Sequence, residues 1–111
     1  MTRRHLTFTC EGATLVGTLD IGQASGSAGL LIVSGGNELR CGAWGGQAQL
    51  AARLASKGFP VFRYDRRGVG DSEGDNPTFR HSGPDIAAAL ATFRAAAPHV
   101  TRVVAWGNCD A

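Results

Sequence analysis

Cys109 is the residue whose type and position most clearly suggest chemistry, because it follows an apolar strand pattern and a glycine in the segment 103–111, VVAWGNCDA. A nucleophile is well exposed at the tip of a sharp turn from a strand into a helix, and such a turn requires small residues two positions before and after it. Gly107 and Ala111 meet that requirement. The positive end of the helix dipole would also stabilise a thiolate at this point. The alternative interpretation is a buried, unreactive cysteine after a strand.

This turn resembles the nucleophile elbow of α/β-hydrolases, with Cys109 where serine usually stands and Ala111 in place of the second glycine. The resemblance implies an oxyanion hole made of two backbone N–H groups, one after the nucleophile and one in the turn after the third strand. Those groups belong to Asp110 and to Gly36, within the sequence Ser34-Gly35-Gly36-Asn37. The glycine turn is equally compatible with an ordinary tight turn, whereas the absence of G-x-G-x-x-G spacing argues against a phosphate loop.

A second recognisable stretch is the glycine- and charge-rich segment 64–74, YDRRGVGDSEG. It resembles the D-x-R-G-x-G-x-S loop that follows the fourth strand in many α/β-hydrolases, where glycines allow unusual backbone angles beside the elbow. The resemblance assigns Asp65, Arg67 and Ser72 to structure rather than to catalysis.

The elements that would position these residues follow from the apolar pattern. Strands are predicted at 6–10, 14–19, 30–33, 60–64 and 100–106, and helices at about 44–56 and about 84–97. The first helix has Leu50 and Leu54 on one face and is expected to stop at Gly58. Two antiparallel strands followed by alternating strands and helices predict an α/β fold with a mostly parallel sheet. The α/β-hydrolase order 1-2-4-3-5 would leave the last strand as an exposed apolar edge.

Composition excludes several classes of function. The chain is 43% apolar and 18% charged with a net charge of +2, as in a globular protein. Its basic pairs, Arg3-Arg4 and Arg66-Arg67, are not interleaved with aromatic residues, so we expect a solvated surface and no nucleic-acid binding. Cys10, Cys41 and Cys109 lack metal-binding spacing, which predicts free thiols in a reducing compartment and neither metal nor cofactor.

No apolar run has the length of a signal peptide or a membrane span, so a cytoplasmic protein without membrane insertion is expected. The oligomeric state stays open. A cysteine nucleophile also needs a base, which in α/β-hydrolases follows the nucleophile in the chain. The three histidines, His5, His81 and His99, all precede Cys109. We therefore expect residues 1–111 to be an incomplete α/β-hydrolase domain, with strands one to five and the elbow, that is inactive alone.

A narrower resemblance rests on four segments taken together, namely 8–17, 33–40, 64–74 and 106–111. They resemble the exosortase A system-associated hydrolase 1 family, bacterial α/β-hydrolases with Gly-x-Cys-Asp at the elbow that occur with exopolysaccharide and protein-sorting systems. The resemblance implies hydrolysis of an ester, thioester or amide bond in a small-molecule or acyl substrate. The sequence departs from the family at Gly42-Ala43-Trp44, where a more polar segment is expected. A non-catalytic α/β binding module and an acyltransferase on the same fold are the alternatives.

Overall fold

Strands and helices alternate along residues 2–22, 26–33, 39–42, 45–74 and 83–107, which the computed structural model describes. Within these ranges the strands are β1 (Thr2–Cys10), β2 (Ala13–Ile21), β3 (Ala28–Val33), β4 (Val61–Tyr64) and β5 (Arg102–Gly107), and the helices are α1 (Gly46–Ser56) and α2 (Gly83–Ala96). Each of these elements overlaps a predicted one, and β1, β2 and β3 extend beyond their predicted ends. The predicted α/β fold is confirmed.

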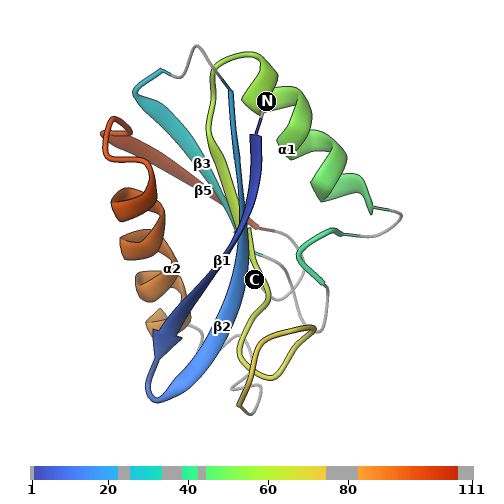
Figure 1. The fold of residues 1–111 in the computed structure, drawn as a ribbon, viewed down its shortest axis with the longest axis vertical. Helices are drawn as coiled ribbons and strands as arrows, with labels where there is room; N and C mark the ends of the chain where they lie inside the picture. Colours follow the sequence, from blue (N-terminus) through green and yellow to red (C-terminus); the bar gives the residue numbers. More distant parts are fainter. Residues whose placement is uncertain (1, 23–25, 34–38, 43–44, 75–82, 108–111) are drawn as a thin grey trace.

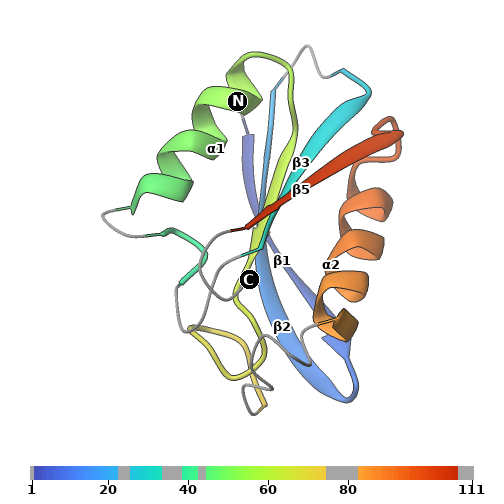
Figure 2. The same cartoon turned by 180° about the vertical axis from the view of Figure 1, so that it is seen from behind.

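The strands form one mixed sheet in the expected order, β1-β2-β4-β3-β5. The pairs β1–β2 and β2–β4 are antiparallel, whereas β3 runs parallel to both β4 and β5. The helices α1 and α2 lie on opposite faces of the sheet, as Figure 1 and the reverse view in Figure 2 show. Because β3, β4 and β5 are parallel, their carboxyl ends meet at one edge, where ligands commonly bind in open α/β sheets.

The face of the sheet that α2 covers is apolar. Leu15, Leu19, Phe62 and Tyr64 from the strands are buried in one cluster with Phe93 of α2. The rings of Phe62 and Phe93 stack with their centroids 5.8 Å apart. Full burial of a large apolar side chain contributes about 1.5–3 kcal/mol, so this cluster is a main source of stability for the sheet.

The helix α1 covers the other face through small side chains. Ala51 is buried against Val61, and Ala55 is buried as well. The helix passes so close that a Cβ added at Gly22 would lie 2.3 Å from the carbonyl oxygen of Ala55. Leu50, on the apolar face that the pattern indicates, is instead 38% exposed. Alanine occupies two of the three buried positions of α1, where larger side chains would hold the helix away from the sheet, and Gln47 occupies the third.

Gly58 ends α1, as predicted. Its backbone has a φ of 95°, and its N–H donates to the carbonyl of Ala55 at 3.1 Å. The N–H of Phe59 donates to the carbonyl of Leu54 at 2.9 Å. This pair of bonds is the Schellman motif, which requires a left-handed residue and therefore favours glycine. The helix thus stops where the chain has to turn back into β4.

The strand β5 lies at the edge of the described sheet and pairs there with β3. Its side chains Val104 and Trp106 are 62% and 44% exposed. Val104 also lines an apolar groove of about 320 Å³ together with Leu54 and Phe59. The expected exposed apolar edge strand is therefore present.

Candidate functional site

The predicted nucleophile and oxyanion residues, Cys109, Asp110 and Gly36, lie outside the described residues. The strands that lead to them are described. Val33, the last residue of β3, pairs with Gly107, the last residue of β5, in a parallel ladder. The carboxyl ends of β3 and β5 therefore lie side by side at the same edge of the sheet.

Asp65, directly after β4, is a buried acceptor around which the next loop is built. Its carboxylate accepts the backbone N–H groups of Arg40 at 2.7 Å and of Asp71 at 3.0 Å. Its carbonyl accepts the hydroxyl of Ser72 at 2.7 Å, and that hydroxyl oxygen accepts the N–H of Val16 at 2.9 Å. These contacts fasten the loop to the sheet, which confirms structural roles for Asp65 and Ser72.

Gly70 lets this loop pass close to Asp65. Its φ is 56°, and an added Cβ would lie 2.5 Å from Oδ2 of Asp65. Any other residue would adopt a strained backbone and also collide with the buried carboxylate. The predicted role of the glycines in this loop is confirmed at this position.

Arg67 joins the same loop to the start of α2. Its N–H and Nε donate to the fully buried carboxylate of Asp85 at 3.0 Å and 3.1 Å, and its Nη1 donates to Glu11 at 2.9 Å. The hydrogen bond to Asp85 raises the pKa of Arg67. The structural role of Arg67 is confirmed. The expectation of a solvated Arg66-Arg67 pair is wrong, since Arg66 is fully buried.

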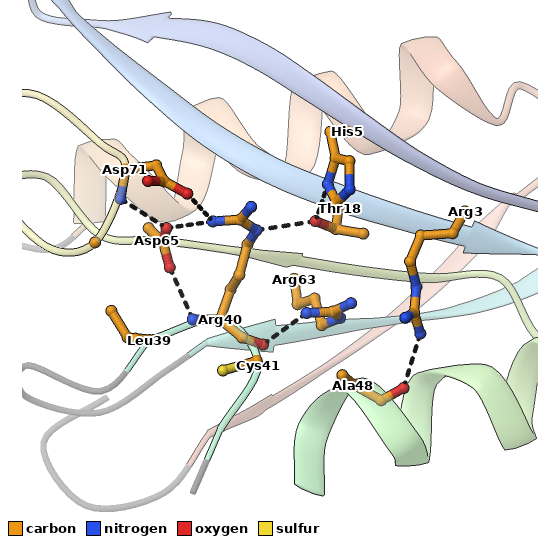
Figure 3. A pocket seen from close by; sticks show the side chains of 11 residues that line it. Arg3, His5, Thr18, Leu39, Arg40, Cys41, Ala48, Arg63, Asp65 and Asp71 are labelled. Carbon is orange, nitrogen blue, oxygen red and sulfur yellow. Dashed lines mark hydrogen bonds and ion pairs between the residues drawn. The ribbon is translucent and has the colours of Figure 1, made fainter. Parts of the chain in front are cut away.

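Arg40 has no role assigned from the sequence pattern, yet it lies at the centre of a polar network (Figure 3). Its guanidinium forms an ion pair with Asp65 and a second one with Asp71 at 3.1 Å. Its Nε donates to the hydroxyl of Thr18 at 2.9 Å. Asp65 is 25 residues away along the chain, so no local motif signals the pair. Its only sequence signal is its place at the end of the segment 33–40.

A cleft of about 410 Å³ opens beside this network. A row of polar residues from three strands lines it, because His5 of β1 pairs with Thr18 of β2, which pairs with Arg63 of β4. Figure 3 shows these side chains on one face of the sheet. Nδ1 of His5 lies 2.9 Å from the Thr18 hydroxyl, and Nη1 of Arg63 donates to the carbonyl of Arg40 at 3.1 Å. Alternating polar residues in the strands are the signal that could have revealed this row.

Arg3 borders the same cleft near α1. Its Nε and Nη2 donate to the buried carboxylate of Asp20 at 2.8 Å and 2.7 Å, and Nη2 also donates to the carbonyl of Ala48 at 3.0 Å. The hydrogen bond to Asp20 raises the pKa of Arg3. A bidentate pair of this kind fixes the side chain, and Arg3 is nevertheless exposed, as expected for a surface arginine.

The two cysteines within the described residues, Cys10 and Cys41, are free thiols, as predicted. The thiol of Cys10 is buried, donates to Asp85 at 3.3 Å and accepts from Arg67 at 3.4 Å. Burial, followed by the hydrogen bond to Asp85, raises the pKa of Cys10. A thiol that keeps its proton is a poor nucleophile, so Cys10 is unsuited to catalysis. Cys41 is half-buried and lines the cleft.

The histidines are distributed around the sheet. His5 lines the cleft, and His99 lies three residues before β5, at the amino end of that strand. His81 falls outside the described residues. That none of the three is the catalytic base stays a prediction.

Among the residues that the structure describes, no group of three or more His, Cys, Asp or Glu side chains is arranged to hold a metal ion. Within the same residues, neither helix has the length and apolar character needed to cross a membrane.

Comparison with known proteins identifies the fold. No protein-family model and no curated protein sequence matches the chain, but solved structures do. The α/β-hydrolase GrgF from Penicillium sp. sh18 matches 98% of this chain with a TM-score of 0.81 and 27% identity. An esterase from Pyrococcus furiosus matches 96% of the chain with a TM-score of 0.76 and 19% identity. Est1E from Butyrivibrio proteoclasticus, solved with ferulic acid bound, matches 93% of the chain with a TM-score of 0.77 and 20% identity.

The sheet order and the two helices are those of the amino-terminal part of the α/β-hydrolase fold. The match covers 38% of GrgF, 40% of the Pyrococcus furiosus esterase and 42% of Est1E. The chain therefore spans about two fifths of the length of these proteins.

Proposed function

We propose that residues 1–111 form the amino-terminal part of an α/β-hydrolase domain that cleaves an ester, thioester or amide bond, with Cys109 as the nucleophile. The observation that supports this most directly is the pairing of Val33 with Gly107 at the ends of β3 and β5. In the α/β-hydrolase arrangement these two strand ends lead to the oxyanion turn and to the nucleophile. The likeness to hydrolase structures supports the same assignment.

In the proposed reaction the thiolate of Cys109 attacks the carbonyl carbon of the substrate. The backbone N–H groups of Gly36 and Asp110 stabilise the oxyanion that forms. The bond to the leaving group then breaks, and a histidine acid beyond Ala111 protonates that group, which leaves an acyl-thioester. Water, deprotonated by the same histidine, hydrolyses the thioester, releases the carboxylic acid and restores the thiol. We place the histidine and its acid partner after Ala111 because the order in this fold is nucleophile, acid, histidine.

The proposal can be tested with the full-length protein and 4-nitrophenyl butyrate. Changing Cys109→Ala should reduce kcat/KM at least about 10³-fold, because the nucleophile is removed. Cys10→Ala is the matched control, since this thiol is buried in the cluster under α2, outside the cleft. Mass spectrometry should also find an acyl group on Cys109 during turnover. Full activity in the Cys109→Ala variant would show that the nucleophile is misassigned.

The alternatives give different results in the same assay. An acyltransferase would form an ester or amide when an alcohol or amine acceptor is added, at the expense of the free acid. A binding module would turn over no ester and show no labelled cysteine. Association with an exosortase or exopolysaccharide system is supported by the sequence resemblance alone, and cytoplasmic localisation is likewise a prediction from the sequence.

A further inference from the structure

Arg63 is a buried cation whose hydrogen-bonding capacity is only partly used. Its residue exposure is 4%, and it lines the cleft described above. Nη1 donates to the carbonyl of Arg40, whereas Nε has no hydrogen-bond partner within the described residues. An unpaired buried donor on a charged group is costly, and such groups are normally paired with an anion.

The carboxylates nearby are already engaged by other arginines. Buried Asp20 is paired with Arg3, and buried Asp65 is paired with Arg40. The remaining carboxylate of the cleft, Asp71, is 72% exposed and is also paired with Arg40. Within the described residues, the ion pairs of these three carboxylates are thus made with Arg3 and Arg40, and none is made with Arg63.

The neighbouring charges act on Arg63 in both directions. Burial lowers the pKa of Arg63, the charge of Asp20 raises it, and the neighbouring cations Arg3 and Arg40 lower it further. An arginine nevertheless stays protonated at neutral pH. Figure 3 shows the Arg63 side chain between those of Arg40 and Arg3, so an anion in the cleft would face more than one guanidinium.

The size and place of the cleft suit a small molecule. A volume of about 410 Å³ lies within the range of ligand pockets. The border of the cleft includes residues 39–41, which begin three residues after Gly36 in the chain. It also includes Asp65, which directly follows β4. The cleft is therefore next to the carboxyl edge of the sheet, where the proposed nucleophile segment begins.

We infer that this cleft binds an anionic group of the substrate, a carboxylate or a phosphate, with Arg63 as the principal charge partner. A guanidinium donates two parallel hydrogen bonds to either oxyanion, and Arg63 forms no ion pair within the described residues that would compete with such a group. Anion binding itself does not depend on Cys109, whereas the assignment of the anion to the substrate rests on the proposed hydrolase function.

The first experiment measures anion binding to the full-length protein. Inorganic phosphate and acetate are titrated separately, at ionic strength held constant with sodium chloride, while the Nε–Hε signal of Arg63 is followed by nitrogen-15 NMR. We expect a saturable shift of that signal with at least one anion, and the anion that produces it identifies the chemical class. An unchanged Arg63 signal with both anions overturns the inference.

Calorimetry with the same anions then compares two substitutions. Arg63→Met should weaken binding at least about tenfold, since hydrogen bonds from a charged group are lost. Arg94→Met, an exposed arginine of α2 on the opposite face of the sheet, should leave binding unchanged. Equal affinity in the Arg63→Met variant and in the unmodified protein would contradict the assignment, and so would equal losses in both variants.

The second experiment tests whether the anion belongs to the substrate. Hydrolysis of 4-nitrophenyl hemisuccinate, which has a carboxylate, is compared with that of the neutral 4-nitrophenyl butyrate. Arg63→Met should lower the kcat/KM ratio of hemisuccinate to butyrate about tenfold or more, and an unchanged ratio overturns the assignment to substrate. Anion binding at Arg63 without turnover of either ester would instead contradict the proposed hydrolase function and leave the anion site standing.

Discussion

Replacing Tyr64 with phenylalanine should stabilise the protein, because the change removes a buried hydroxyl that is not hydrogen-bonded. Tyr64 is fully buried in the cluster under α2, and its hydroxyl has no partner within the described residues. Its ring meets Phe8 edge-on with centroids 6.1 Å apart, a contact that phenylalanine would keep. An unsatisfied buried hydroxyl costs about 1–3 kcal/mol, and the small void left by the oxygen offsets a few tenths of that.

We therefore expect Tyr64→Phe to raise the free energy of unfolding by about 1 kcal/mol at neutral pH. In a full-length domain more than twice as long as this chain, such a change raises Tm by about 2 °C. Urea and thermal unfolding followed by circular dichroism measure both quantities.

The difference should grow at alkaline pH. Burial, followed by the charge of Asp85, raises the pKa of Tyr64 well above its ordinary value. An unfolded chain releases the phenolic proton above about pH 10, while the folded chain retains it, so folding becomes less favourable as pH rises. At pH 11 the ionisation of the unfolded state removes about 1.4 kcal/mol from the unmodified protein and nothing from the variant. The stability gap should thus widen to about 2.4 kcal/mol.

Ultraviolet titration at 295 nm measures tyrosinate in the unmodified protein and in the Tyr64→Phe variant. The difference between the two curves isolates the ionisation of Tyr64. It should show no tyrosinate until the protein unfolds. A variant that is less stable than the unmodified protein, or a gap that stays constant between pH 7 and pH 11, would refute the reasoning, because the hydroxyl would then have a partner or be accessible to water.

Two substitutions test the loop after β4. Asp65→Asn should lower the free energy of unfolding by about 3 kcal/mol, since it breaks the buried pair with Arg40. The control is Asp71→Asn, which changes a carboxylate that is 72% exposed. Equal losses of stability for the two variants in urea denaturation would contradict the assigned burial of Asp65. Gly70→Ala should cost about 2 kcal/mol, from the left-handed backbone and the collision with Asp65. Gly12→Ala is the control, because Gly12 has a left-handed backbone with φ 82° but an added Cβ there would meet nothing within 4 Å. A larger loss of Tm for Gly12→Ala than for Gly70→Ala would contradict the proposed collision with Asp65.

Much of the fold could be predicted because its signals are local. Alternating apolar residues mark β1 and β2, and the continuous apolar run at 30–33 marks β3, which is covered on both faces. Gly58 ends α1 through a motif that involves only the six consecutive residues 54–59. The side of α1 that contacts the sheet was less predictable, because helical spacing favours Leu50 whereas the close approach of the helix selects Ala51 and Ala55.

The cleft could not be predicted because its contacts join distant parts of the chain. Arg40 is 22 residues from Thr18 and 25 from Asp65, with which it interacts. The polar row from His5 to Arg63 has the alternation of a strand with a solvated face. Only the tertiary arrangement shows that the face is partly covered and that Arg63 is buried. A charged residue in a strand pattern predicts an exposed side chain. That prediction fails for Arg63, whose guanidinium donates to the carbonyl of Arg40 in the segment that lies over the strand.

The two faces of the sheet are built from the same strands but have different functions. Successive residues of β4 alternate between them, so that Phe62 and Tyr64 join the apolar cluster under α2 while Val61 and Arg63 point toward α1. Because the α2 side holds the large apolar side chains, the α1 side does not need to be filled with them. That side can therefore keep three arginines and a cleft next to the carboxyl edge. The face under α2 supplies the apolar core. The face under α1 can therefore place charged side chains beside the carboxyl edge, where we propose the active site, without a loss of core packing.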